Sequence, residues 1–540
     1  MPEHLRTLIV ILVLATAVFA FAKAPACAAA STTGDFDRRR NLWLGITLMA
    51  FLAHNFWIYI AGVGLMLLFV APREPNKMAL YFFVLFAVPP LSAPISGLGV
   101  INHFFAIDYP RLLALTVLLP AFLHLAAQPD TERFGRSLPD KFLLGYLILQ
   151  GMLMLYYSSL TNTLRVGVFY QFIDVFLPYY VASRALKNLR QFRDVLMAFV
   201  VATLVLSAIG LFEYVRHWLL YSPLENALGV RWGFGNYLGR GDSLRAQGST
   251  GQPIVLGYIM AVAIGFFLYL KKSVPNTPLW HCGLTALCAG LFASISRGPW
   301  VGAAAMLLIY IAMGPAPAKN IIKLGVLGGI LFLALLVSPY SEKVIDLLPF
   351  VGTADVENIT YRQRLLEISV QLMLQNPILG AADFMYSPAM QELKQGEGII
   401  DLVNTFVGIG LSSGFVGLFF FTGFFLAVLA GIYKAMRGLA DRNDEQHLLG
   451  QALLSVLLGI LVIIFTVSSV SVIPLVYWSV AGLGAAYVRM LALARVPQTA
   501  PHSGHPSSVR LQPTGRTPRP PAGRSQTPAQ HKNIFKINKL

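Results

Sequence analysis

Residues 401–433 read DLVNTFVGIGLSSGFVGLFFFTGFFLAVLAGIY, and the last 29 of them contain no charged side chain. A helix needs about 20 apolar residues to cross the hydrocarbon core of a bilayer, so this stretch predicts a transmembrane helix over 405–433. Two polar residues, Asp401 and Asn404, stand directly before it. Polar residues at the mouth of a span are either interfacial anchors or parts of a site, and this stretch alone leaves both readings open.

The whole chain has the composition of a membrane protein. Of its 540 residues, 56% are hydrophobic and 12% charged, against roughly 25% charged in an ordinary soluble domain. Its apolar segments are too long and continuous for the alternating strands of a barrel, so helices are expected throughout. We predict an all-α polytopic membrane protein with about 13 transmembrane helices. The expected spans are 5–22, 42–71 (as one long or two short helices), 78–94, 109–127, 142–158, 163–182, 195–215, 252–270, 279–296, 299–314, 320–338, 405–433, 447–468 and 470–494.

Five regions are expected along the chain. They are a first span or signal-like segment with a basic loop (1–41), a transmembrane bundle (42–338), a long outer-face loop (339–404), C-terminal transmembrane helices (405–494) and a disordered basic cytoplasmic tail (495–540). The start of the chain fits a cleaved signal peptide and an uncleaved first span equally well. The three cysteines have no metal-ligand spacing and are interpreted as packing residues.

The distribution of basic residues predicts the orientation. The tail holds eight of the 41 lysines and arginines and no acidic residue, which is typical of a cytoplasmic segment. Counting spans back from the tail also puts the basic segments 184–193, 271–272 and 434–442 on the cytoplasmic side. The basic segment 36–41 is on that side only if 42–71 crosses the membrane twice or forms a re-entrant hairpin. The loop at 216–251, the turn at 295–300 and the connection 339–403 are then on the outer face. For the tail we expect anionic membrane lipids as a partner rather than nucleic acid, or simply a solvated tail.

Arginines are the candidate binding residues on this outer face. Arg240 and Arg245 stand near three glycines, and an arginine fork suits bidentate binding of phosphate. The alternative is that both reach up to lipid headgroups. Arg297 lies between two apolar spans with almost no loop around it, and a charge at the hydrocarbon boundary usually faces a cavity or a partner.

The 339–403 connection contains a pattern typical of an amphipathic helix. Within 361–375, Tyr361, Leu365, Ile368 and Leu372 share one stripe, with Arg364 on another face, and Pro377 is expected to end the helix. One interpretation is that Arg364 faces a site over the bundle. The other is an interfacial helix with a surface pair between Arg364 and Glu367.

Four stretches are considered together: RAQGSTGQPIVLG (245–257), SISRGPW (294–300), YRQRLLEISVQLMLQNPILGAADF (361–384) and VNTFVGIGLSSGFVGL (403–418). In this order they resemble the motifs of the O-antigen ligase and Wzy-type polysaccharide polymerase superfamily. The pattern around NHFFAIDYPRLLALTVLLPAF (102–122) and FLPYYVASRALKN (176–188) looks closer to the exopolysaccharide-polymerase branch of that superfamily. The resemblance implies a GT-C-like, metal-independent inverting glycosyltransferase of the cell inner membrane without a cofactor. Its implied donor is an undecaprenyl-pyrophosphate-linked oligosaccharide on the periplasmic face, and other polysaccharide export proteins are implied partners.

By position, Arg245, Arg297, Arg364 and Asn404 match family residues, but the family's histidine, the implied base, is replaced by Val403. A base must take the proton from an acceptor hydroxyl, which valine cannot do. Asp401 is our candidate; Glu397, His103 and a route without a dedicated base are alternatives. We therefore predict Asp401, Arg364 and Arg297 as catalytic and Arg245, Arg240 and Asn404 as substrate-binding.

Two other functions remain compatible with the sequence. A ligase that transfers finished glycan to another acceptor would use the same machinery. A lipid-linked sugar transporter would also have many spans, although the chain has no internal repeat and few ionisable residues in the middle of spans.

Overall fold

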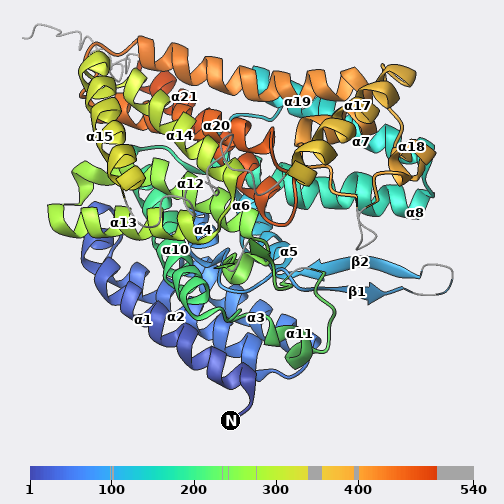
Figure 1. The fold of residues 1–540 in the computed structure, drawn as a ribbon, viewed down its shortest axis with the longest axis horizontal. Helices are drawn as coiled ribbons and strands as arrows, with labels where there is room; N and C mark the ends of the chain where they lie inside the picture. Colours follow the sequence, from blue (N-terminus) through green and yellow to red (C-terminus); the bar gives the residue numbers. More distant parts are fainter. Residues whose placement is uncertain are drawn as a thin grey trace, which may run out of the picture. The chain divides into compact units, whose positions relative to one another are not determined.

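A computed structural model describes residues 1–97, 99, 102–233, 235–240, 243–274, 276–337, 356–394 and 400–495. Most of this part is helical (Figure 1). Ten of the described helices are long and apolar enough to cross a membrane, which makes the chain a multi-pass membrane protein. They are α1 (Glu3–Ala29), α3 with η1 (Phe56–Arg73), α5 to α6 (Tyr109–Ala127), α7 (Leu138–Tyr157), α8 to α9 (Leu160–Ala185), α10 (Leu189–Arg216), α12 with η5 (Pro253–Ser273), α19 (Thr405–Arg437), α20 (Glu445–Ile464) and α21 (Ile473–Arg495).

The other described helices are shorter or less apolar, except α15 (Pro317–Val337), which has 21 residues and a largely apolar sequence. Two of them, α13 (Thr277–Ala293) and α14 (Arg297–Met313), are apolar but have only 17 residues each. The remaining ones are α2 (Thr33–Leu52), α4 (Lys77–Val84), α11 (Pro223–Leu228), α15 (Pro317–Val337), α17 (Val356–Gln375) and α18 (Pro388–Gln391). The expected all-α polytopic class is confirmed, whereas a count of 13 spans is not.

The structure decides between the two alternatives for one predicted span and contradicts another. The stretch 42–71 forms two helices, α2 and α3, separated by His54 in a left-handed conformation and by Asn55, whose side chain caps α3. The predicted span 78–94 is wrong: α4 ends at Val84, and Pro89 and Pro90 follow soon after it.

The chain then continues into a β-hairpin that the helical interpretation missed. Strands β1 (Ser92–Ser96) and β2 (His103–Asp108) pair antiparallel, with Ser92 opposite Asp108, and extend away from the helices (Figure 1). Pro94 lies within β1, which proline tolerates because a two-stranded sheet has only edge strands. A second, two-residue pair is formed by β3 (Gly239–Arg240) and β4 (Ser243–Leu244).

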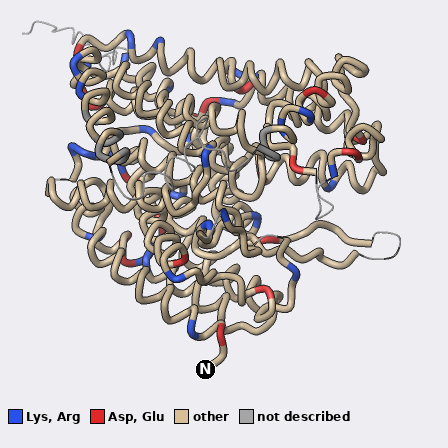
Figure 2. Tube along the Cα trace, viewed as in Figure 1, with Lys and Arg blue, Asp and Glu red and all other residues tan. Residues whose placement is uncertain are grey.

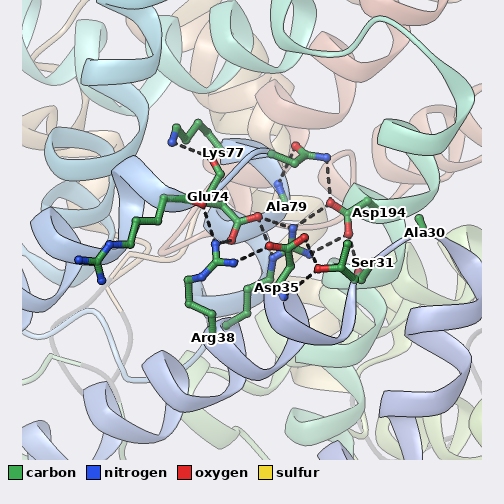
Figure 3. A network of polar contacts seen from close by, with 12 residues as sticks. Ala30, Ser31, Asp35, Arg38, Glu74, Lys77, Ala79 and Asp194 are labelled. Carbon is green, nitrogen blue, oxygen red and sulfur yellow. Dashed lines mark hydrogen bonds and ion pairs between the residues drawn. The ribbon is translucent and has the colours of Figure 1, made fainter.

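A buried ion-pair network joins α2 to α10 at one end of the bundle (Figure 3). The Arg39 guanidinium, 2% exposed, donates to Asp194 Oδ1 at 2.8 Å and Oδ2 at 2.9 Å and to Glu74 Oε1 at 3.2 Å. The Ser31 hydroxyl also donates to Asp194 Oδ1, and the Asn76 side-chain amide donates to Asp194 Oδ2. The network puts the basic segment 36–41 at the same end as 184–193, as the charge pattern predicts for a double crossing.

The helices differ in how much of their surface is buried by protein. Within the described residues, α10, α12, α20 and α21 are mostly buried, whereas α1 and α7 bury one narrow side each. Helix α19 is long and apolar, with Lys434 and Arg437 in its last turn. Figure 2 shows that charged residues are sparse along most of the described chain. The basic tail expected over 495–540 lies outside the described residues from position 496 onward.

Candidate functional site

Two of the predicted arginines bind the turn between α13 and α14. Arg240, in β3, donates to the Ile295 carbonyl at 3.3 Å. Arg245, just after β4, donates to Ser296 Oγ at 3.1 Å, and its Nε lies 3.5 Å from the Ser294 carbonyl. Arg240 and Arg245 therefore fix β3 and the end of β4 to the turn at 294–296. The sequence motifs at 245–257 and 294–300 meet here.

The turn itself has a strained backbone. Ile295 has a φ of 43° although it is β-branched and only 1% exposed. Such a conformation costs on the order of 1–3 kcal/mol and persists where the surroundings hold it in place. The two arginine contacts and a hydrogen bond from Ala246 N to Ala293 O at 3.0 Å provide that support.

Arg297 follows directly as the first residue of α14 and is half-buried. Ser296 makes no capping bond to α14 with its side chain, because its Oγ accepts from Arg245 and donates to the Ser294 carbonyl. The positive end of the α14 dipole thus lies beside Arg240, Arg245 and Arg297. This positive charge favours the binding of an anion such as pyrophosphate.

Glu213 positions the segment that carries Arg245, a function that the sequence analysis missed. This α10 residue is 1% exposed, and its Oε2 accepts from Gln247 N at 2.9 Å and Gly248 N at 2.8 Å. Its Oε1 accepts from Leu220 N at 3.0 Å. The sequence does contain a signal for this function: Glu213 is a carboxylate near the end of an apolar span. A buried charge needs hydrogen-bond partners, so such a residue is expected to hold a neighbouring segment in place.

The loop between α20 and α21 connects the N-terminus of α14 with that of α19. On one side, a Cβ added at Gly298 would lie 2.6 Å from Thr466 Oγ1. On the other, Thr405 Oγ1 donates to the Val467 carbonyl at 2.8 Å. Asn404 is the N-cap of α19, and its Oδ1 accepts from Phe406 N at 2.9 Å.

Asp401 is exposed and is held by the same loop. Its Oδ1 accepts from Ser468 Oγ at 3.0 Å and from Val403 N at 3.3 Å. Within the part of the chain that the structure describes, its Oδ2 has no hydrogen-bond partner. The oriented carboxylate therefore keeps one oxygen available to accept a proton.

Tyr361 of α17 also fixes Asp401. Its hydroxyl donates to the Asp401 carbonyl and accepts from the Asp401 N–H, both at 3.1 Å. Burial raises the pKa of Tyr361 above its usual value, so this hydroxyl stays protonated at neutral pH. This contact links the amphipathic helix to the mouth of α19.

The predicted amphipathic helix is confirmed, and it ends at Gln375, before Asn376 and Pro377. Leu365 is 3% exposed in a small core that includes Phe384 and Leu411, and Tyr361, Ile368 and Leu372 pack against it. Val403 packs against the same core, which explains why the position can hold valine. Arg364 is exposed and pairs with Glu392 at 3.4 Å rather than with Glu367.

The structure brings the candidate residues together in part. Arg240, Arg245 and Arg297 form one group at the 294–297 turn. Asp401 and Asn404 form a second group across the α20–α21 loop, and Arg364 lies one helical turn beyond Tyr361 on α17. His103 is separate, in β2, where its carbonyl accepts from Arg165, and Glu397 lies outside the described residues.

Among the described residues, no three histidine, cysteine or acidic side chains are grouped to hold a metal ion. Residues 282–422 match a family model described as O-antigen ligase. This stretch includes Arg297, Arg364, Asp401 and Asn404, while Arg240 and Arg245 precede it. The predicted resemblance is thereby confirmed. No curated protein sequence matches the chain.

Proposed function

Because residues 282–422 match the O-antigen ligase family, we propose that this membrane protein is a polysaccharide polymerase of the cell inner membrane. In this proposal it joins undecaprenyl-pyrophosphate-linked repeat units at the periplasmic face, in exopolysaccharide or O-antigen biosynthesis. The end of the bundle that carries Arg240, Arg245 and Asp401 is the periplasmic end, and the basic tail is cytoplasmic. Anionic lipids and other polysaccharide export proteins are its expected partners.

The observation that carries the proposal is the arginine group at the 294–297 turn. Arg240 and Arg245 both donate to this turn, and Arg297 begins α14 directly after it. Glycosyl transfer from a lipid pyrophosphate develops negative charge on the leaving group. Guanidinium groups held in place before the reaction stabilise that charge in the transition state, and they do so without a metal or cofactor.

Asp401 supplies the base in this proposal. The acceptor hydroxyl oxygen attacks the anomeric carbon of the donor sugar while the bond from that carbon to the pyrophosphate oxygen breaks. The lipid pyrophosphate leaves with the electron pair, and Asp401 Oδ2 takes the hydroxyl proton. Attack opposite to the leaving group inverts the anomeric configuration. Ser468 and Tyr361 act as positioning residues, since they hold the Asp401 side chain and backbone.

Arg364 and Asn404 have supporting functions in this scheme. The side chain of Arg364 is 59% exposed and that of its partner Glu392 64% exposed. An anionic ligand can replace such an exposed ion pair at small cost. Asn404 uses Oδ1 to cap α19, which leaves its amide N–H groups for a substrate oxygen.

A ligase that moves finished glycan to another acceptor is the second candidate, and the family description itself favours it. Both reactions need the same leaving-group and base chemistry. They differ in the product, which is a longer lipid-linked glycan for a polymerase and glycan on a different acceptor for a ligase.

The test uses purified membranes, a lipid pyrophosphate-linked repeat unit and the unchanged protein beside Arg364→Ala and Asp401→Asn at equal abundance. Long glycan that both substitutions abolish supports the polymerase and its base. Transfer only to an added second acceptor would identify a ligase. Movement of labelled lipid between leaflets without any glycosyl transfer would overturn the enzymatic proposal in favour of a transporter.

A further inference from the structure

The segment that follows α17 contributes to two cavities of opposite polarity. A cavity of about 240 Å³ has polar groups from Gln375, Asn376, Asp383, Tyr386 and Ser387. An apolar cavity of about 400 Å³ is lined by Pro377, Ile378, Phe415, Val416, Phe419 and Phe420. The polar cavity has no assigned function in the scheme above.

The apolar cavity indicates where the lipid boundary lies. Ile378 is 66% exposed, Phe415 53% and Phe419 61%, all in a chain whose long helices are membrane-spanning. Large apolar side chains exposed together on such a surface are expected to contact lipid. The polar cavity then opens at the water side of this boundary, where a membrane-anchored glycan leaves the bilayer.

The polar groups of the cavity are available to a ligand. Within the described residues, the side chains of Gln375, Asn376 and Asp383 have no hydrogen-bond partner in the protein. They supply both donors and acceptors, and Tyr386, which is 83% exposed, adds an aromatic ring with a hydroxyl. Ser387 Oγ accepts from Met390 N at the start of α18 and still has its own proton to donate.

This set of groups suits a sugar better than a phosphate. Among the described residues that line the cavity, Asp383 is the only charged one, so it repels an anionic headgroup and no lysine or arginine of this set offsets it. Amide and carboxylate oxygens accept the hydroxyl protons of a sugar, and an aromatic face covers its apolar C–H side. A volume of about 240 Å³ equals roughly eight water molecules, which is enough for one sugar ring but not for a chain.

We propose that this cavity is a sugar-binding subsite that holds one ring of the acceptor glycan away from the reacting hydroxyl. Leu372, which lines it, is eight residues from Arg364 on α17, or about 12 Å along the helix axis. A ring bound here would orient the acceptor relative to Asp401 and contribute to acceptor selection. The assignment of the ring to an acceptor rests on the proposed function, whereas sugar binding itself does not.

The experiment measures sugar binding directly. Purified full-length protein in phosphatidylcholine nanodiscs, which contain no sugar detergent, is mixed with the methyl glycosides of glucose, galactose, mannose and N-acetylglucosamine. Saturation-transfer NMR then reports contact with each. We expect a signal from at least one glycoside that falls about tenfold in each of two variants. Tyr386→Ala removes the aromatic face, and Asp383→Asn removes a hydrogen bond to a charged group. Tyr156→Ala and Glu367→Gln are matched controls, because both side chains are exposed outside the cavity.

The two proposals can fail separately. If the unchanged protein gives no signal, or if Tyr386→Ala and Asp383→Asn bind like the controls, the subsite is wrong even where Arg364→Ala abolishes transfer. If phosphatidylglycerol vesicles remove the signal of the bound glycoside and other glycosides do not, the cavity binds lipid headgroups. That result would also overturn the proposed sugar subsite. Sugar binding that is lost in both variants supports the subsite even if no glycosyl transfer occurs. In an active enzyme, a rise in KM for the acceptor with little change in kcat would be the kinetic sign.

Discussion

Gly380 and Gly414 contact each other through their backbones where α17's connection meets a break in α19. Gly380 has a φ of 68° and Gly414 a φ of 63° with a ψ of −164° inside the helix. A Cβ at Gly380 would lie 2.6 Å from Gly414 N, and a Cβ at Gly414 would lie 2.7 Å from Gly380 N. Backbone bonds from Ala381 N to Leu411 O (2.8 Å) and from Phe415 N to Pro377 O (2.7 Å) complete the junction.

The junction makes the position of α17 dependent on α19. The break at Gly414 frees backbone groups of α19, and the 377–381 segment supplies their partners, as a membrane environment requires. Because Arg364 and Tyr361 are on α17, the geometry between them and Asp401 depends on this contact.

Alanine at either glycine is predicted to release α17. Gly414→Ala and Gly380→Ala each combine a positive φ with a backbone clash, which costs about 1–3 kcal/mol or more. We expect faster amide exchange in residues 361–394, measured by hydrogen–deuterium exchange, and a loss of activity. Gly325→Ala is the control, since no atom of the described residues lies within 4 Å of a Cβ there and alanine favours the helix. Unchanged exchange in both junction variants would show that the junction does not hold α17.

A second prediction concerns the Arg39 network. Arg39→Ala leaves the buried carboxylates of Glu74 and Asp194 without the guanidinium that both accept from, and among the described ion pairs Glu74 keeps only the one with Arg38 at 3.7 Å. Breaking a buried ion pair costs about 3–5 kcal/mol, so a clear fall in melting temperature is expected. Arg40→Ala, a more exposed neighbour that pairs with Asp37, is the matched control. A melting temperature equal to that of this control would contradict the importance of the network.

The Arg39→Ala deficit should depend on pH. Burial already raises the pKa of Glu74, and the Arg39 charge opposes that rise, so removing Arg39 raises the pKa further. A carboxyl group with a raised folded pKa contributes stability at low pH that is lost as pH increases through that pKa. The deficit relative to the unchanged protein should therefore be smaller at about pH 5.5 than at about pH 8. Thermal unfolding at both values measures this, and an equal deficit would count against Glu74 as the uncompensated group.

Apolar length predicted most of the fold because a membrane span is determined by local composition. It failed at 78–94, where Met78 to Val88 is as apolar as a span but the two prolines end it and a hairpin follows. The amphipathic stripe of Tyr361 to Leu372 was predictable from its spacing. The partner of Arg364 was not, since Glu392 lies 28 residues away in the chain and only the fold brings it close.

The candidate site likewise combines residues that the sequence identifies with contacts that only the fold reveals. Residue type identified Arg240, Arg245 and Asp401 as candidates, but not what holds them. Glu213 accepts hydrogen bonds from backbone N–H groups. Such bonds do not depend on the side chains of the donor residues, so the sequence does not reveal them. Likewise, the two glycines of the junction occur among many glycines in the chain, and only their conformation separates them.

Lysine should not replace Arg245. Its ammonium group could contact Ser296 Oγ or the Ser294 carbonyl but lacks the planar fork that reaches both, so the strained turn before Arg297 would be less well held. We expect Arg245→Lys to lower glycan formation about tenfold and Arg245→Ala more. The assay compares product per amount of protein in membranes. Arg231→Ala, an exposed arginine of the same loop, is the control, and full activity of Arg245→Lys would show that charge alone suffices.

Asp401→Asn separates a base from a structural contact. Asparagine keeps an oxygen that can accept from Ser468 and Val403, so the mouth of α19 should remain folded, but its amide cannot take a proton. Removing a general base typically lowers the rate by a factor of about 10² to 10⁴, and we expect kcat to fall in this range with little change in KM. Ser468→Ala removes only the orienting hydrogen bond, so a smaller loss is expected from it. The comparison needs both variants at equal abundance, with Tyr361→Phe as a third that tests the contact to the Asp401 backbone. If Asp401→Asn keeps most of the activity while Ser468→Ala or Tyr361→Phe loses it, the loop geometry is what matters and the proton goes elsewhere.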